Sequence, residues 1–322
     1  MRAVIVRWGI DELPAVLAEL EISELLLVAS PRWTNERLPL APAATWTQVP
    51  SHRVLDAAAG AGDGVVAVGG GSAIDLGKAV SAEKDVPLVS VPTTYAGAEW
   101  TPYFGIRDPA RKMRGGGAGA TLGGAVYEPR LTLSLPRPET VGTALNALAH
   151  CAEALYVEGH NDEADAHALE GARLIAEWLP QVVERPDDLE VRTHLLEGAM
   201  HAGAALGKSM LALGHAMAQA LGGRYGLPHG AMNAIVLPAA LRFNRDVASA
   251  AVTRFGEAVG GDPVERVKEL ARLGGFERLR DHGVPADELP AVAAAAAERP
   301  GARANPRRAT PADIEELLRS VY

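Results

Sequence analysis

The sequence has 322 residues, of which 48% are hydrophobic and 22% charged, a balance typical of a globular protein with a full core. A formal net charge of −9 without any basic run argues against nucleic acid or an anionic membrane as a partner, because both need clustered Lys or Arg. The single cysteine, Cys151, excludes an internal disulfide, and the lack of a leader pattern or a long apolar run predicts a cytoplasmic protein without a membrane span.

The first part of the chain, from Ala3 to about Pro136, alternates short runs rich in β-branched residues with stretches of helical length. The runs have the sequences AVIVRWG, LLLVAS, GVVAVGGG, PLVSVPTT and LTLSLP. This alternation is typical of βαβ units around a parallel sheet. We therefore predict a Rossmann-like α/β domain over residues 1–136.

The second part is different, because β-branched runs give way to long segments rich in Ala, Leu and Glu. Such segments favour helices, and they span about 138–158, 163–184, 188–204, 208–223 and 229–244, followed by shorter ones. The Ala-rich stretch from residue 291 is interpreted as a helix that ends at Pro300 and Gly301. We predict that residues 137–322 form an all-helical domain.

Three glycines, Gly69, Gly70 and Gly71, stand between a predicted strand at 63–68 and a predicted helix at 72–83. They would form the turn at the carboxyl end of a parallel strand, where α/β sheets bind ligands. Free N–H groups and the helix dipole favour an anion there, and glycine lets the backbone approach it closely, so a pyrophosphate is a natural ligand. The alternative is that these glycines only form a tight turn, since neither familiar phosphate-binding fingerprint is present.

A second loop of this kind follows the next predicted strand, where VPTTYAGAEWTP places Thr93 and Thr94 after Pro92. The two hydroxyls could bind phosphate or ribose oxygens, and a helix-capping threonine beside a proline turn is the alternative. After the earlier run LLLVAS, Ser30 stands where an acidic residue would bind a ribose 2′-hydroxyl, and Arg32 follows. For a dinucleotide ligand, Arg32 could therefore contact a 2′-phosphate.

The helical part carries the other candidate chemistry. In TALNALAHCAEALY, Asn146 and His150 are four residues apart and share one helix face, with Glu153 a turn further on. Cys151 points about 100° away from His150, so the two do not form a nucleophilic pair.

Two further histidines have similar surroundings of small residues: His215, four residues before Gln219, and His229, directly after Pro228. A single histidine on an Ala/Leu face is more often a satisfied core residue. Three in such contexts favour one cluster of His150, His215 and His229. The remaining histidines have polar neighbours and are interpreted as solvated, namely His52, His160, His167, His194, His201 and His282.

Five stretches between about residues 60 and 320 follow one another in the order of motifs found in one protein superfamily. In chain order they are GGGSAIDLGKA, PTTYAGAEWTP, NALAHCAEALY, the pair GHAMAQALGG and LPHGAMNAIVLP, and NPRRATPADIEELL. They resemble the successive motifs of the iron-containing alcohol dehydrogenase superfamily, which also contains glycerol dehydrogenases, dehydroquinate synthases and maleylacetate reductases. PTTYAGAEWTP and NALAHCAEALY are most similar to the maleylacetate reductase branch.

The resemblance implies NADH or NADPH as the cofactor, bound by the α/β domain. It assigns the pyrophosphate and neighbouring groups to Gly69, Gly70, Gly71, Ser72 and Asp75, and the rest of the nicotinamide site to Thr93, Thr94, Thr101 and Lys112. It also implies that the helical domain supplies the catalytic residues, which are His150, His215, His229, Asn146 and Gln219.

Metal-dependent members of the superfamily bind their metal through an Asp and three His. The His positions match His150, His215 and His229, but Asn146 stands at the Asp position, and a neutral amide binds Fe²⁺ more weakly than a carboxylate. Maleylacetate reductases tend to lack this Asp, so we expect no metal, although three histidines alone could hold Zn²⁺. Gln219 stands where the superfamily usually has another His, and it cannot relay a proton at neutral pH.

We therefore predict a metal-independent reductase that transfers hydride from NADH or NADPH to a small oxo-acid or conjugated carbonyl compound. The histidines would stabilise an oxyanion or donate a proton, and Asn146 would bind substrate or orient His150. A dicarboxylate would also need cationic partners, for which Lys112 and Lys208 are candidates. We expect a small-molecule substrate and a homodimer.

Three alternatives remain open for the function. The chain could be a metal-dependent alcohol dehydrogenase. It could be a lyase or cyclase that uses bound nicotinamide without net redox chemistry. It could also be a nucleotide-binding protein whose active site has decayed, given Asn146 and Gln219.

Overall fold

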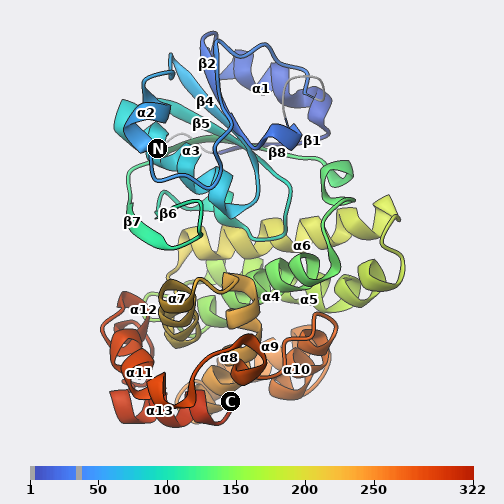
Figure 1. Ribbon diagram of the computed structural model, residues 1–322. Helices are drawn as coiled ribbons and strands as arrows, with labels where there is room; N and C mark the ends of the chain where they lie inside the picture. The colour runs from blue at the N-terminus through green and yellow to red at the C-terminus, as the bar shows by residue number, and fades with distance from the viewer. Residues whose placement is uncertain (1–3, 34–37) are drawn as a thin grey trace. The chain divides into compact units, whose positions relative to one another are not determined.

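The structure is a computed structural model that describes residues 4–33 and 38–322 (Figure 1). The predicted first run begins at Ala3, which lies outside the described residues. The chain divides into two compact units. Unit 1 comprises Met1–Thr94 and Ala98–Ser134, and unit 2 comprises Tyr95–Gly97 and Leu135–Tyr322.

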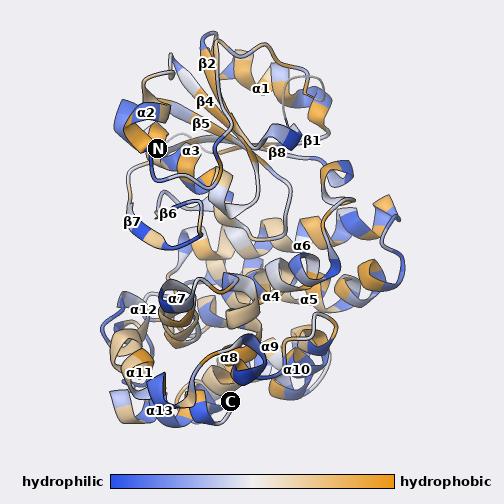
Figure 2. Ribbon diagram, in the orientation of Figure 1, coloured by the Kyte–Doolittle hydropathy of each residue, from blue (hydrophilic) through white to orange (hydrophobic). Residues whose placement is uncertain are grey.

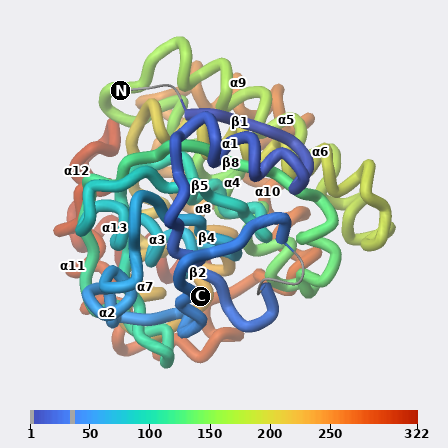
Figure 3. Tube along the Cα trace, turned by 90° about the horizontal axis from the view of Figure 1, so that it is seen from above, coloured from blue at the N-terminus to red at the C-terminus, as the bar shows by residue number. Residues whose placement is uncertain are grey.

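Unit 1 is built around a parallel sheet with the strand order β1-β8-β5-β4-β2-β3. Its strands are β1 (Ile5–Trp8), β2 (Leu25–Ala29), β3 (Ala44–Trp46), β4 (Gly64–Gly69), β5 (Pro87–Pro92) and β8 (Thr121–Tyr127). Each neighbouring pair is parallel, and Figure 3 shows β1, β8, β5, β4 and β2 following one another in this order. The predicted parallel α/β fold is confirmed.

Helices cover both faces of this sheet. Successive residues of a strand point to opposite sides, so neighbouring residues pack against different helices. In β2, Leu27 packs in the same core cluster as α1 (Leu13–Glu19). Leu26 packs on the other face, with α2 (Val54–Ala58) and α3 (Gly71–Lys84). The central strands β4 and β5 are therefore mainly hydrophobic (Figure 2).

The structure corrects the prediction at the end of unit 1. The predicted strand LTLSLP is not a strand, because its first residues complete the 3₁₀ helix Pro129–Thr132. The strand that joins the sheet is β8, in which Gly123 and Gly124 interrupt the β-branched pattern. A Cβ on Gly124 would lie 2.9 Å from Cγ1 of Val16, so the glycine lets α1 approach the sheet closely.

Two further strands of unit 1 were not expected from the sequence. β6 (Phe104–Arg107) and β7 (Met113–Gly117) form an antiparallel hairpin apart from the main sheet. β7 is exposed along its whole length and contains three glycines, so it carries neither the alternation nor the β-branched residues that predict a strand.

Unit 2 is helical, as predicted. Its α-helices are α4 (Arg137–Ala154), α5 (Asp162–Glu184), α6 (Leu189–Lys208), α7 (Leu213–Tyr225), α8 (His229–Asn244), α9 (Ser249–Val259), α10 (Pro263–Arg272), α11 (Leu289–Ala297), α12 (Pro300–Arg303) and α13 (Pro311–Arg319). Pro300 and Gly301 begin α12, so they do more than end the preceding helix. Over the described part of the chain, no helix has the length and apolar character needed to cross a membrane.

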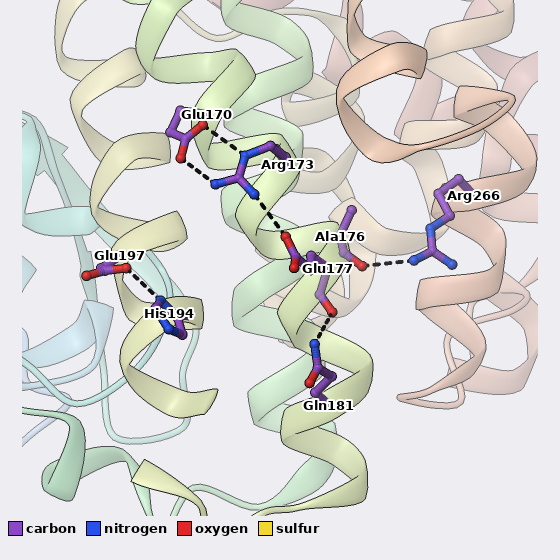
Figure 4. Close-up of polar contacts among 8 residues, drawn as sticks. All are labelled: Glu170, Arg173, Ala176, Glu177, Gln181, His194, Glu197 and Arg266. Carbon is purple, nitrogen blue, oxygen red and sulfur yellow. Dashed lines mark hydrogen bonds and ion pairs between the residues drawn. The ribbon is translucent and has the colours of Figure 1, made fainter. Parts of the chain in front are cut away.

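Helix α5 shows how the helices of unit 2 pack. On its inner side, a Cβ on Gly171 would lie 2.9 Å from Sγ of the buried Cys151, so α4 and α5 approach closely only because this residue is glycine. Its outer side carries charges instead, where Arg173 pairs with Glu170 and Glu177 (Figure 4). One apolar and one charged side make α5 amphipathic.

Candidate active site

The three glycines of unit 1 lie where β4 meets α3. Gly69 ends the strand, Gly70 is the N-cap residue and Gly71 begins the helix. The φ angle of Gly69 is +150°, a conformation that favours glycine. Gly70 has no side chain to cap α3, so the first N–H groups of the helix can bind a ligand, and the helix dipole favours an anion.

Strand β5 brings the threonine loop to the same edge of the sheet. Gly69 is the register partner of Pro92, and the N–H of Thr93 donates to the carbonyl of Gly69 over 3.0 Å. Thr94 lies beside Gly70, where an added Cβ would come within 2.9 Å of Cγ2 of Thr94. The structure thus brings the glycine turn and the two threonines together.

Two other predicted cofactor residues, Asp75 and Thr101, lie in a network around Lys78. The Nζ atom of Lys78 is 3.3 Å from Oδ1 of Asp75, 3.3 Å from Oγ1 of Thr101 and 2.9 Å from the carbonyl oxygen of Tyr103. Asp75 also accepts a hydrogen bond from the N–H of Gly105 over 3.2 Å. Burial raises the pKa of Asp75, and the charge of Lys78 opposes this shift. Lys78 was not predicted, although it stands one helical turn after Asp75.

Three cationic residues named from the sequence lie at more open positions. Lys112 is exposed in the turn between β6 and β7. The guanidinium of Arg32, beyond the end of β2, lies 4.8 Å from the ring centroid of Trp33. Lys208, at the end of α6, pairs with Glu163 over 2.7 Å, so its charge is already compensated within unit 2.

The three predicted histidines of unit 2 lie together, although they come from α4, α7 and α8. The ring centroids of His150 and His215 are 4.8 Å apart with 18° between the planes, and those of His215 and His229 are 5.7 Å apart. His150 and His215 are buried, and His229, the first residue of α8, is half-buried. The structure therefore brings these imidazoles into one cluster.

His215 is oriented by Glu153 of α4. Its Nδ1 atom lies 2.7 Å from Oε2 of Glu153. The same carboxylate accepts from the backbone N–H groups of Ala212, over 2.6 Å, and of His215, over 3.1 Å. A carboxylate accepts only, so Nδ1 carries the proton. The Nε2 atom, which is buried without a hydrogen-bond partner among the described residues, is the one that can act on a ligand.

Asn146 and Asn233 connect the other two histidines. The backbone carbonyl of Ala96 faces Asn146 at 3.1 Å, and because a carbonyl only accepts, the facing atom is Nδ2. Oδ1 of Asn146 then accepts from Nδ2 of Asn233 over 2.7 Å. The remaining amide hydrogens face Nε2 of His150, at 3.4 Å, and Nε2 of His229, at 3.1 Å. Both of these Nε2 atoms are therefore hydrogen-bond acceptors.

This arrangement does not fit the metal site of an Asp and three His. The amide of Asn146 carries no charge, and its oxygen already accepts from Asn233. Amide N–H groups also face the Nε2 atoms of His150 and His229, on the side where a metal would need a lone pair. In residues 4–33 and 38–322, no group of three or more His, Cys, Asp or Glu side chains is arranged to hold a metal ion.

Gln219, the remaining predicted site residue, contacts an arginine that was not predicted. Its Oε1 atom accepts from Nη1 of Arg299 over 3.3 Å, and its backbone carbonyl lies 3.3 Å from Nη2. Gln219 is half-buried on α7, one turn after His215. The sequence around Arg299 predicts only a helix end, so no local pattern could have identified this contact.

Asn233 was also not predicted, although a signal was available. It stands four residues after His229 on α8 and therefore on the same helix face, as Asn146 does relative to His150. Cys151 is buried, and desolvation raises the pKa of its thiol, which agrees with the prediction that Cys151 and His150 do not form a nucleophilic pair.

Comparisons with known proteins agree with this fold. The family described as "Iron-containing alcohol dehydrogenase" matches residues 4–120, and "Fe-containing alcohol dehydrogenase family, C-terminal" matches residues 140–322. A maleylacetate reductase of Burkholderia cepacia is 38% identical over 270 residues, or 83% of this chain and 76% of that protein.

Two solved structures extend the likeness over nearly the whole chain. Maleylacetate reductase from Agrobacterium tumefaciens is 29% identical, with a TM-score of 0.89 over 100% of this chain and 97% of that one. An iron-containing alcohol dehydrogenase from Corynebacterium glutamicum is 29% identical, with a TM-score of 0.90 over 99% of this chain and 94% of that one.

The parallel α/β unit, the helical unit and these likenesses define the class of protein, which is an NAD(P)-dependent oxidoreductase. The chain belongs to the iron-containing alcohol dehydrogenase family and, within it, to the maleylacetate reductase branch. The resemblance seen in the five sequence motifs is thereby confirmed.

Proposed function

We propose that this enzyme transfers hydride from NADH or NADPH to a small oxo-acid or conjugated carbonyl compound of the maleylacetate type, without a metal. The observation that carries the proposal is the buried pair of His215 and Glu153, with Nδ1 2.7 Å from the carboxylate and Nε2 without a hydrogen-bond partner among the described residues. Relatives named maleylacetate reductase support the substrate class.

Unit 1 binds the dinucleotide in this proposal. The N–H groups at the start of α3 and the glycine backbone hold the pyrophosphate, with Ser72 in the first turn of the helix. Thr93 and Thr94, beside the glycine turn, hold neighbouring oxygens. Asp75 completes the surroundings of the pyrophosphate, and Thr101 and Lys112 complete the nicotinamide site.

Unit 2 acts on the substrate. Glu153 stabilises the imidazolium form of His215, whose Nε2–H then donates to the oxyanion or enolate that develops as hydride arrives. His150 and His229 each accept a hydrogen bond at Nε2, so each ring carries its proton on Nδ1. Such a pair orients and polarises the substrate, while His215 moves the proton.

Asn146 and Asn233 fix the histidine rings in position, a task that a metal ion performs in a metal-dependent site. Each amide donates one hydrogen to an oxygen and the other to an imidazole nitrogen. These hydrogen bonds fix both the orientation and the tautomer of each ring. A fixed imidazole cluster needs no reorganisation as charge develops on the substrate. This supports a metal-independent reaction.

The test is to follow oxidation of NADH and NADPH at 340 nm with maleylacetate and a panel of small oxo-acids and aldehydes. Each reaction is run after EDTA treatment, and again with added Fe²⁺ or Zn²⁺. We expect turnover with an oxo-acid, at a rate that EDTA treatment does not lower and added metal does not raise. A requirement for metal would favour an alcohol dehydrogenase instead, and conversion of substrate without net NAD(P)H consumption would favour a lyase.

A further inference from the structure

Arg299 is anchored against α7, the helix that carries His215, by the way α12 packs. It is the N-cap residue of α12, and a Cβ on Gly301 in that helix would lie 2.5 Å from the backbone oxygen of Ala212, so α12 sits directly on the start of α7. From there the guanidinium reaches Gln219, where Nη1 and Nη2 lie 3.3 Å from Oε1 and from the backbone oxygen.

This guanidinium has no counter-charge. In the described ranges no Asp or Glu forms an ion pair with Arg299, and its Nε is buried without a hydrogen-bond partner. Desolvation lowers the pKa of Arg299. A partly buried cation whose contacts are all neutral is costly to a protein, and such groups are normally paired.

Neighbouring arginines behave differently. Arg303, four residues further on, pairs with Glu298 at 3.2 Å and is exposed. Arg224, at the end of α7, pairs with Glu288 at 2.6 Å. Acidic residues are therefore available in this part of unit 2, and the absence of one at Arg299 is a local feature of that site.

The position of Arg299 relates it to His215. Its partner Gln219 is four residues after His215 on α7, so the two side chains stand on the same helix face, one turn apart. The residue that holds the guanidinium is therefore one helical turn from His215. The guanidinium fork matches a carboxylate in a bidentate manner.

We propose that Arg299 binds a carboxylate group of the substrate and that this enzyme therefore selects carbonyl compounds that carry a carboxylate over neutral ones. The inference rests on the proposed reductase function and adds the residue that sets its substrate class. Gln219 holds the guanidinium in position through its side-chain and backbone oxygens. Of the candidates expected from the sequence, Lys208 is already paired with Glu163, and Lys112 is exposed in the turn between β6 and β7.

The test compares Arg299→Met and Arg299→Lys with the matched control Arg303→Met, which removes an exposed guanidinium from the same short helix. Each variant is assayed with maleylacetate and with its dimethyl ester, which has the same reducible group without carboxylates. We expect Arg299→Met to raise KM for maleylacetate by about 100-fold and to leave the ester unchanged. Arg299→Lys keeps the charge but not the fork, so its KM should lie between those of Arg299→Met and the wild type.

An equal loss of activity on the acid and the ester in Arg299→Met would overturn the proposal, because the arginine would then act only on the fold. If the wild type reduces neither compound, the proposed reductase function is wrong, whatever the role of Arg299. Calorimetry with succinate, a dicarboxylate without a reducible carbonyl, then decides the role of Arg299. Binding that Arg299→Met abolishes and Arg303→Met retains supports the proposal, and any other result overturns it.

Discussion

Nδ1 of His215 lies 2.7 Å from Oε2 of Glu153, and their side chains are only 1% and 0% exposed. Replacing the carboxylate in Glu153→Gln removes the charge that stabilises the imidazolium form of His215. We expect kcat to fall by about 100-fold or more, since proton transfer by a positioned group contributes about 10²–10⁴-fold. The amide would also face the N–H groups of Ala212 and His215 with fewer acceptor sites, which should cost about 1–3 kcal/mol of unfolding free energy.

Turnover and urea unfolding measure these two effects separately. Glu158→Gln is the matched control, because Glu158 is exposed just beyond the same helix and should tolerate the change in both assays. Full kcat in Glu153→Gln would contradict the role of His215 in proton transfer.

The amide network gives a second prediction, which concerns metal binding. Asn146→Asp supplies the negative charge that three histidines alone lack, so this variant should bind Fe²⁺ or Zn²⁺ at least ~10-fold more tightly than the wild type. It also loses the hydrogen bond to the carbonyl of Ala96, so some stability should be lost. Metal content after dialysis, measured by mass spectrometry, checks the expectation. Asn161→Asp adds the same charge at the exposed start of α5 and should bind no extra metal.

The sequence predicts those parts of the fold whose signals are local. The turn from β4 into α3 follows from a β-branched run, three glycines and an Ala-rich helix, and it lies where expected. β8 escaped prediction because Gly123 and Gly124, which let α1 pack closely, also remove the strand pattern. Residues chosen for the packing of a distant element thus weaken the local signal.

The candidate site divides in the same way. His150 with Asn146, and His229 with Asn233, are neighbours by helical spacing, so the sequence contains each pair. That the pairs meet through the two amides depends on the packing of α4 against α8, which no local pattern encodes. Arg299 is the extreme case, because its sequence neighbours Glu298 and Pro300 are typical of a solvated helix end, whereas its contacts lie on α7.

The glycine turn gives a third prediction, which separates a binding role from a structural one. Gly71 is the first residue of α3, has an ordinary φ angle, and a Cβ there would meet no atom within 4 Å. The fold alone therefore does not require glycine, and Gly71→Ala should gain about 0.4–1 kcal/mol of stability. If the turn holds a pyrophosphate, the added methyl group occupies the ligand's space, and KM for NADH or NADPH should rise by about 10-fold.

Thermal unfolding and initial rates at varied NADH and NADPH test both halves of this expectation. Gly261→Ala is the matched control, because a Cβ at that position also meets nothing within 4 Å and the residue lies in unit 2. An unchanged KM in Gly71→Ala would mean that the glycine serves only the turn.

His167 on α5 and His201 on α6 are half-buried, so their interpretation as solvated is wrong, and this pair gives a prediction for pH. Their Nδ1 atoms lie 2.9 Å apart, so one ring donates and the other accepts, and protonating both rings would break the bond. Burial lowers the pKa of both residues, and the charges of Lys208 on His167 and of His167 on His201 lower them further. Glu163 opposes this shift at His167, and Glu170 does so at His201.

Because these pKa values lie below the value of about 6.5 expected in the unfolded chain, the unfolded state binds more protons in mild acid. The stability from the pair is therefore complete above about pH 6.5 and is lost as the pH falls toward the lowered values. His201→Gln removes this term, so urea unfolding at about pH 7.5 and pH 5.5 should show a smaller loss of stability than in the wild type. His52→Gln changes an exposed histidine and should leave the wild-type loss intact, and an equal loss in His201→Gln would contradict the assignment.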